Sequence, residues 1–266
     1  MPNDPRRPLF ERPPVVEVAC GVQFEGLIEW RTTHYGQFWT TIKDQFPETE
    51  DHPPLPRVRP TLTPTPPFQP EWSPLPPLRR VFFIKPPGNF LIQLQQNRLF
   101  YNWRKVADSD DYPRFEAPLA GFRSAWAQFN HFTSEAGLPT PAPEIWELTY
   151  INHILDEGAQ FPRDVWEYLG FYEKSPEATP PTPATAMAIQ FVWPLENESG
   201  LLTLDVKHGN RLSDRRDVLI MELTVRGPAK GGSNGIEPWF EIAHQHIVNT
   251  FDKLTTRRAH QLWGEL

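Results

Sequence analysis

Residues 81–104 have the sequence VFFIKPPGNFLIQLQQNRLFYNWR, which gives the strongest indication of the fold. The stretch contains three runs rich in β-branched and aromatic residues, Val81–Lys85, Phe90–Gln95 and Leu99–Arg104, separated only by short turns. Connections this short join antiparallel strands, because a parallel pair needs a crossover of roughly a dozen residues or more. The stretch therefore predicts three consecutive antiparallel strands.

A long amphipathic helix is predicted to follow these strands. From Phe115 to Ala136, apolar residues recur every three or four positions, which is the spacing of one helix face. Gly137 suits the position just after a helix, and nearby prolines prevent continuation. Before the strands, Val16–Glu25 alternates apolar and polar residues, which predicts a half-buried strand, and a short helix is expected at His34–Gln45.

The same order of elements is predicted to occur a second time. Its members are a strand at Glu144–Asn152, a short helix at Pro162–Leu169, strands at Met187–Trp193, Leu201–Val206 and Val218–Arg226, and a long helix at Glu237–Leu262. One long helix per half can cover only one face of a sheet. We therefore expect an α+β fold with a pseudo-twofold duplication of strand, helix, three strands and long helix.

In this arrangement, residues 14–138 and 144–266 are the two halves of a single domain spanning 1–266. They share one continuous antiparallel sheet of about eight strands, with the two long helices on one face. The arrangement resembles the saddle of TATA-binding-protein-like folds, or a helix-grip fold if the sheet curls around its helices. These likenesses concern the fold and carry no function.

Residues 47–78 are predicted to form a proline-rich insertion. Repeated proline removes backbone donors and fixes φ, so extended, polyproline-type structure is expected. One interpretation is a ligand for a proline-recognising domain. The favoured one is a loop that wraps the fold, with Leu62, Phe68 and Trp72 held on its surface. A second proline-rich stretch, 175–183, takes the corresponding place in the other half.

Composition excludes several classes of protein. A formal net charge of −7 argues against a dedicated binder of duplex DNA, because phosphates require a basic face. The single cysteine, Cys20, excludes disulfide frameworks and cysteine-based metal sites, and it fits a reducing compartment. The sequence has neither a secretory signal nor an apolar run of about 18 residues. A cytoplasmic protein that does not span a membrane is expected.

Strand alternation predicts a polar sheet face opposite the long helices. Apolar residues such as Val16, Phe90 and Phe191 are expected to face the helices. The other face is expected to carry Glu17, Gln23, Gln93, Gln95, Gln190, Thr203, Asp205, Glu222, Thr224 and Arg226. Since glutamine both donates and accepts hydrogen bonds, this face suits a peptide, a nucleotide or a protein surface. A solvated face, common in antiparallel sheets, is the favoured alternative.

Few residues are arranged for chemistry. The loop GPAKGGSNG (227–235) precedes a helix, so the backbone amides of Lys230, Gly231, Gly232 and Ser233 are candidates for binding an anion. It lacks the GxxxxGK[ST] spacing, and a flexible connection is the favoured interpretation. His244 and His246 diverge by about 200° on a helix and cannot share a metal. The sequence indicates no metal site, no cofactor and no catalytic constellation.

Three segments resemble a sporadically distributed family of uncharacterised prokaryotic proteins of similar length. PLFERPPVVEVACGVQFEGL (8–27) is similar to the family's opening strand, and AHQHIVNTFDKLTTRRAHQLWG (243–264) is similar to its closing helix. LTYINHI (148–154) is similar to the central strand, although Thr149 stands where the family commonly has arginine. The resemblance implies no activity, cofactor or catalytic residue. Patchy distribution is typical of mobile islands and implies an accessory role in defence systems.

Three functions remain open. The leading hypothesis is a non-enzymatic binding or protein-interaction module whose partner is another protein or a second copy. The alternative is a small-molecule-binding protein or enzyme of helix-grip type, which holds its ligand between the sheet and a long helix. The third is nucleic-acid binding through the sheet face, disfavoured by the acidic net charge. An enclosed cavity with convergent polar groups would argue against the first hypothesis, and a packed core with an open saddle against the second.

Overall fold

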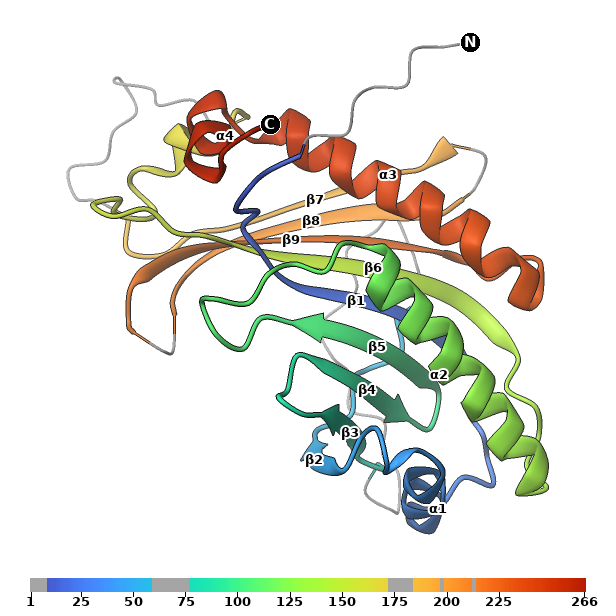
Figure 1. The fold of residues 1–266 in the computed structure, drawn as a ribbon. Helices are drawn as coiled ribbons and strands as arrows, with labels where there is room; N and C mark the ends of the chain where they lie inside the picture. Colours follow the sequence, from blue (N-terminus) through green and yellow to red (C-terminus); the bar gives the residue numbers. More distant parts are fainter. Residues whose placement is uncertain (1–8, 59–76, 172–183, 197–198, 212–213) are drawn as a thin grey trace.

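The protein is built on one open antiparallel sheet (Figure 1). Its structure is a computed structural model that describes residues 9–58, 77–171, 184–196, 199–211 and 214–266. The first half contains β1 (Val15–Phe24), α1 (Thr32–Ile42), β2 (Glu48–His52), β3 (Arg80–Lys85), β4 (Phe90–Gln95), β5 (Arg98–Arg104) and α2 (Glu116–Glu135). The second half contains β6 (Pro143–Ile154), the 3₁₀ turn η1 (Val165–Glu167), β7 (Ala188–Pro194), β8 (Leu201–Asn210), β9 (Asp217–Pro228), the 3₁₀ turn η4 (Gly232–Gly235), α3 (Ile236–Leu254) and α4 (Arg257–Trp263).

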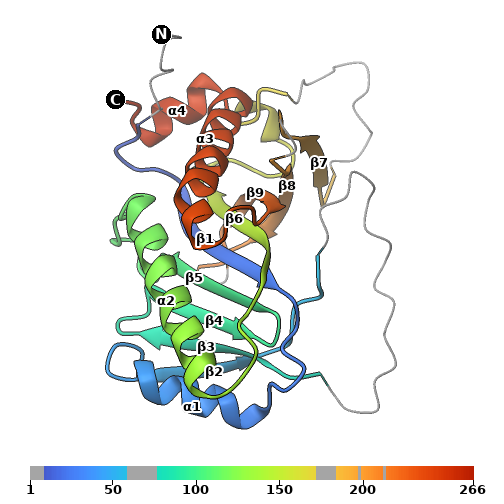
Figure 2. The same ribbon diagram turned by 90° about the vertical axis from the view of Figure 1, so that its right-hand side faces the viewer.

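The strand order places the first strands of the two halves side by side. Within the described residues the sheet runs β2-β3-β4-β5-β1-β6-β9-β8-β7, and all of its pairs are antiparallel. α2 packs on β5 and β1, α3 packs on β6 and β9, and both helices lie on the same side of the sheet (Figure 2). The predicted α+β fold with two long helices on one face is confirmed. The duplication of the halves stays a prediction.

The sheet has one strand more than the sequence predicts. The additional strand, β2, pairs with β3 at the edge of the sheet and lies inside the predicted insertion 47–78. Its sequence, ETEDH, has no apolar alternation, because all five residues are polar and most are exposed. Charged side chains are a common protection for an edge strand. Residues 59–76, which include Leu62, Phe68 and Trp72, and residues 175–183 lie outside the described residues.

The predicted C-terminal helix is interrupted. Thr255 and Thr256 have extended backbones, so α3 ends at Leu254 and α4 begins at Arg257. The Thr256 hydroxyl accepts a hydrogen bond from the backbone N–H of Ala259 at 3.3 Å, which caps α4. Threonine is a favourable N-cap because its side chain satisfies an N–H that the helix leaves unpaired. The break brings the end of α4 back towards the N-terminal segment.

The core lies between the sheet and the two long helices. Phe122, Trp126 and Phe129 of α2 and Val18 and Cys20 of β1 are all buried, and they belong to one cluster of apolar side chains that extends through both halves. Burial raises the pKa of the Cys20 thiol, which fits the predicted role of a small apolar core residue. Within the described ranges, neither α2 nor α3 carries an apolar stretch that could cross a lipid bilayer.

Candidate functional site

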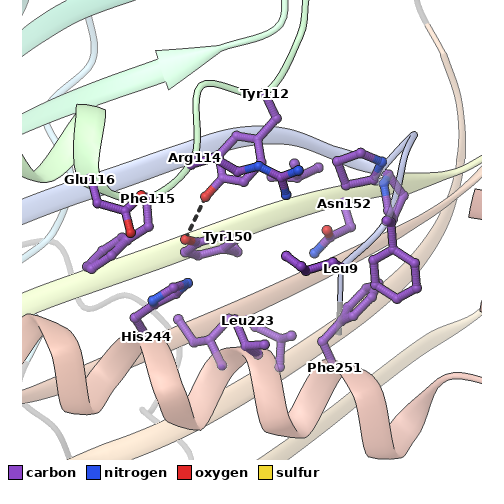
Figure 3. Close-up of a pocket in the computed structure, with 16 residues that line it drawn as sticks. Leu9, Tyr112, Arg114, Phe115, Glu116, Tyr150, Asn152, Leu223, His244 and Phe251 are labelled. Carbon is purple, nitrogen blue, oxygen red and sulfur yellow. Dashed lines mark hydrogen bonds between the residues drawn. The ribbon is translucent and has the colours of Figure 1, made fainter. Parts of the chain in front are cut away.

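A cavity of about 470 Å³ lies between the sheet and α3 (Figure 3). Its floor comes from β1, β6 and β9, one side comes from α3, and the other comes from the loop before α2. The lining residues are Leu9, Phe10, Pro13, Pro14, Val15, Tyr112, Arg114, Phe115, Glu116, Tyr150, Asn152, Leu223, His244, Ile247, Val248 and Phe251. Both halves of the chain therefore contribute to the cavity, whose walls are mainly apolar.

Regular secondary structure explains the α3 and β6 walls. His244, Ile247, Val248 and Phe251 are spaced i, i+3, i+4 and i+7, so they share one face of α3. Tyr150 and Asn152 are two residues apart on β6 and point to the same side of the sheet. These periodicities were visible in the sequence, but periodicity alone cannot distinguish a cavity wall from a packed core.

A bulge at the start of β1 shapes the floor. The register shifts between Val15, which pairs with Asn152, and Glu17, which pairs with Ile151. A bulge adds a residue to one strand and re-aims the side chains before it. As a result Val15 lines the cavity and is buried, whereas Val16, which the sequence places on the helix face, is only half-buried.

Two tyrosine hydroxyls meet in the cavity. The hydroxyl oxygens of Tyr112 and Tyr150 are 2.9 Å apart and hydrogen-bonded (Figure 3). Burial raises the pKa of Tyr150 well above its usual value, and burial likewise raises the pKa of Tyr112. Both phenols therefore keep their protons at neutral pH and act as hydrogen-bond donors.

His244 completes an aromatic layer on the α3 side. Its imidazole stacks on the Phe115 ring at a centroid distance of 4.1 Å and an interplanar angle of 21°. The Tyr150 ring lies parallel to it within 15°, at 5.9 Å. His244 thus joins α3 to the N-terminal end of α2 and to β6, which fixes the position of the tyrosine pair.

Arg114 stands at the rim of the cavity in an unusual backbone conformation. Its φ is +66°, in the left-handed region, and its side chain is exposed. For a residue with a Cβ this conformation costs roughly 1–2 kcal/mol relative to the right-handed helical region. Such strain persists only where the surrounding structure imposes it, and it is often found at ligand sites.

Replacing Arg114 by glycine is expected to raise the free energy of unfolding by about 0.5–1 kcal/mol. The release of left-handed strain, about 1–2 kcal/mol, is partly offset by about 0.5–1 kcal/mol for the greater freedom of glycine in the unfolded chain. Arg215→Gly is the matched control, because Arg215 is also exposed, has φ of +63° and lies outside the cavity. Urea unfolding of both variants measures the change in the free energy of unfolding. A loss of stability in Arg114→Gly alone would contradict a strained backbone at Arg114.

The predicted polar face lies on the side of the sheet opposite the cavity, and at its centre is a buried network. The Arg226 guanidinium donates to Glu147 at 2.7 Å, and the Gln23 amide donates to the same carboxylate at 3.2 Å. Arg98 donates to the Gln23 side-chain oxygen at 2.8 Å. Glu147, Gln23 and Arg98 are each at most 5 % exposed. Desolvation by burial lowers the pKa of Arg98 to about 10.

Residues 53–58, here called the covering segment, lie across one end of the polar face. Gln95 exchanges two hydrogen bonds with the backbone of Leu55, at 2.8 and 2.9 Å. The backbone N–H of Val58 donates to Gln23 at 3.2 Å, and Arg98 donates to the carbonyl of Pro56 at 2.9 Å. Two of the predicted binding glutamines therefore contact this chain's own insertion.

The remaining predicted face residues are spread across the sheet. Gln190 of β7 donates to Asp205 of β8 at 2.8 Å, and Thr203 of β8 pairs with Thr224 of β9. Gln93, on β4, accepts a hydrogen bond from Arg80 at 2.8 Å. Near the middle of the sheet, Glu17 accepts from Asn102 at 2.5 Å, and burial raises the pKa of Glu17. The predicted residues share a face without converging on one point, and their binding role stays a prediction.

The predicted anion loop opens α3. Gly231 and Gly232 have φ of +81° and +55°, and residues Gly232–Gly235 form η4 directly before the helix. The Lys230 N–H donates to the carbonyl of Pro228 at 2.9 Å, and Ser233 lies in a shallow depression beside Arg123 of α2. Anion binding by Lys230, Gly231, Gly232 and Ser233 stays a prediction.

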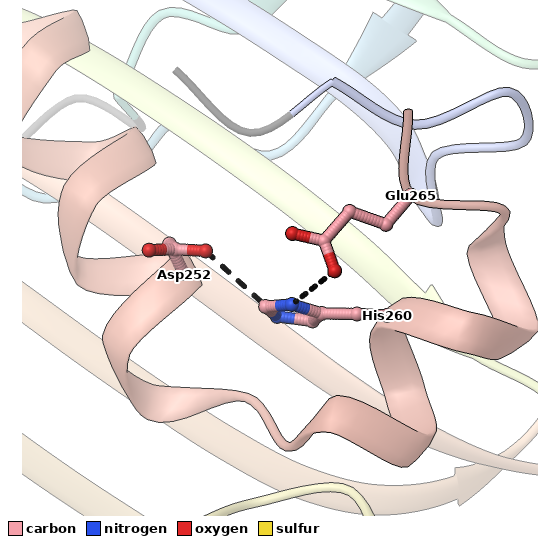
Figure 4. Close-up of side chains that lie close together, drawn as sticks. All are labelled: Asp252, His260 and Glu265. Atoms are coloured by element: carbon pink, nitrogen blue, oxygen red, sulfur yellow. Dashed lines mark ion pairs between the residues drawn. The ribbon is translucent and has the colours of Figure 1, made fainter. Parts of the chain in front are cut away.

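Asp252, His260 and Glu265 form an acidic cluster around a histidine (Figure 4). Glu265 lies 3.5 Å from Nδ1 of His260, whereas Asp252 lies 4.0 Å from Nε2, which is also 2.8 Å from the Thr255 hydroxyl. The two carboxylates approach opposite ring nitrogens, while a metal takes one nitrogen and leaves the other to a second partner. The cluster is best described as a histidine between two carboxylates that connects α3 with α4 and the C-terminal residues.

Comparison with protein-family models, curated proteins and solved structures found no match for this chain. The cavity must therefore be interpreted from its own geometry. Sequence reasoning missed Tyr112 and Arg114, which lie in a loop without a motif, and it missed Tyr150 and Asn152, because strand alternation does not distinguish a cavity wall from a packed core. One sequence feature indicated the cavity: His244 is a polar residue within the apolar stripe of α3.

Proposed function

We propose that the protein binds a small, largely apolar molecule in the cavity between α3 and the centre of the sheet. The observation that carries the proposal is a cavity of about 470 Å³ whose apolar walls surround a few polar groups. Small-molecule sites typically have this composition and volumes of roughly 300–1,000 Å³. They also occur where two structural units meet, as the two halves do here.

The polar sheet face gives less support to an interaction module. Gln23, Gln95 and Arg98 are buried and hydrogen-bonded to the covering segment or to one another, so a partner would have to displace those contacts. Hydrogen-bonding groups that already have good partners gain little from a new one. The interaction module and a role in defence systems stay predictions of the sequence.

Filling the cavity is expected to weaken binding strongly. Val248→Trp adds a large ring from α3, where Val248 is half-buried and lines the cavity. Binding is measured by the fluorescence of the amphipathic anionic probe 1-anilinonaphthalene-8-sulfonate, which we expect to bind the native protein at one saturable site. We expect the variant to bind at least about tenfold more weakly, equivalent to about 1.4 kcal/mol.

Ile242→Trp is the matched control for this experiment. Ile242 also lies on α3, is 44 % exposed and does not line the cavity. We expect it to leave probe affinity unchanged. Saturable binding of equal strength by both variants would place the probe elsewhere, and no saturable binding by the native protein would count against the proposed function.

A further inference from the structure

We infer that the ligand of the cavity is an amphipathic monocarboxylate, with its acid group held by Tyr112, Tyr150 and Arg114 and its chain or ring against the apolar walls. This inference rests on the proposed function and specifies its ligand class. It follows from three features of the cavity: the hydrogen-bonding capacity of the tyrosine pair, the cation at the rim and the separation of polar from apolar lining.

The tyrosine pair has one donor more than it uses internally. Two hydroxyls carry two hydrogens, and the 2.9 Å contact between Tyr112 and Tyr150 uses only one of them. Whichever tyrosine donates, the other keeps a hydrogen that needs an acceptor. A ligand that displaces water from the cavity must supply this acceptor, since a buried unsatisfied donor is costly. A carbonyl or carboxylate oxygen meets this requirement, and an apolar group does not.

Arg114 favours a carboxylate over a neutral carbonyl. Its side chain lines the cavity, and it lies on the same side of the cavity as Tyr112, facing α3 (Figure 3). A guanidinium presents several N–H donors in a plane and pairs with both oxygens of a carboxylate. Its left-handed backbone, two residues before α2 begins, sets the direction in which the side chain leaves the loop.

The rest of the lining accommodates an apolar body. Phe10, Leu223, Ile247 and Phe251 contribute only hydrocarbon or aromatic surface. Phe10 lies on the N-terminal segment and packs edge-on against Phe251, at a centroid distance of 6.2 Å. A single saturated chain of medium length, or one substituted ring, can therefore bury its apolar part while its acid group remains near the rim.

Glu116 places a negative charge at the rim, so replacing it tests whether the ligand is an anion or a cation. Its carboxylate also lines the rim, and like charges repel. Because Glu116 is exposed, water and salt screen this repulsion. We expect Glu116→Gln to tighten carboxylate binding modestly, by about twofold to threefold at low salt. A cationic ligand would respond in the opposite direction.

The test compares three ligands with the same ten-carbon chain: decanoate, decanol and decylamine, each below its micelle-forming concentration. Titration calorimetry with the native protein is expected to show decanoate binding about tenfold more tightly than decanol. Tyr150→Phe, Tyr112→Phe and Arg114→Gln are each expected to lower decanoate affinity several-fold. Because an alcohol oxygen also accepts a hydrogen bond, decanol is expected to lose less affinity than decanoate in the tyrosine variants and to be nearly unchanged in Arg114→Gln. Arg123→Gln is the control, because Arg123 pairs with Glu237 outside the cavity.

The outcomes separate the inference from the proposed function. If decanoate and decanol bind equally and the tyrosine variants change neither, the ligand class is wrong while the cavity still binds apolar molecules. Tightest binding of decylamine would also overturn the inference and would make Glu116 the recognition residue. If none of the three ligands binds, the proposed function itself is wrong. Should Tyr150→Phe fail to fold, Tyr112→Phe, at a half-buried position, provides the same comparison.

Discussion

Replacing Glu147 by leucine is expected to lower the free energy of unfolding by about 3–5 kcal/mol. Glu147 is 5 % exposed and accepts hydrogen bonds from Arg226 and Gln23. Although burial alone would lower the pKa of Arg226, its pKa is raised, because Glu147 stabilises the charged form. Removing the carboxylate leaves the Arg226 charge buried without its partner, which costs more than the ion pair itself contributes.

The double variant Glu147→Leu/Arg226→Met gives the matched comparison. Replacing both members of a buried ion pair by apolar residues of similar size is often neutral. We therefore expect the double variant to recover most of the stability lost by Glu147→Leu, as measured by urea unfolding. A single variant that costs less than about 1 kcal/mol, or a double variant that costs the sum of both single changes, would contradict the role of Glu147.

Gly121→Ala is expected to destabilise the protein by about 1–3 kcal/mol, although alanine is the better helix former. Gly121 lies in α2 where the helix crosses β5. A Cβ at this position would lie 2.2 Å from a ring carbon of Tyr101, which is buried. The helix or the ring must move, and in a close-packed core neither can move without disturbing its neighbours. Thermal or urea unfolding measures the loss.

Gly36→Ala is the control for this change. Gly36 is also inside a helix, α1, but a Cβ there would have no neighbour within 4 Å. The same substitution is therefore expected to stabilise the protein by about 0.5–1 kcal/mol through helix propensity alone. If both variants shift stability in the same direction, the close approach of α2 to Tyr101 is not as described.

Local pattern was sufficient to predict most of the fold. The three short-connected runs at 81–104 became β3, β4 and β5, and period-two alternation placed Gln23 and Gln95 on the same sheet face, where both lie opposite Arg98. Alternation works here because one face of the sheet is buried under helices, so a shift of one residue would expose the core. Local pattern did not predict two features. β2 has no apolar residues, and Thr255 and Thr256 interrupt the last helix.

The candidate site was less predictable, because it depends on tertiary contacts. The tyrosine pair joins residues 38 positions apart, and the β1 bulge determines that Val15 rather than Val16 lines the cavity. The binding role of the glutamines on the polar face stays a prediction. Their engagement by residues 53–58 depends on the path of a proline-rich chain, which side-chain periodicity does not encode.

The most direct test of ligand binding in the cavity between the sheet and α3 is methyl NMR during titration with decanoate. We expect the methyl signals of Leu223, Ile247 and Val248, which line the cavity, to shift saturably with a single dissociation constant. Ile84 and Leu91, which form a separate buried cluster with Phe82, serve as internal controls and should not move. Shifts confined to Ile84 and Leu91, or no saturable shift at any cavity methyl, would contradict binding between the sheet and α3.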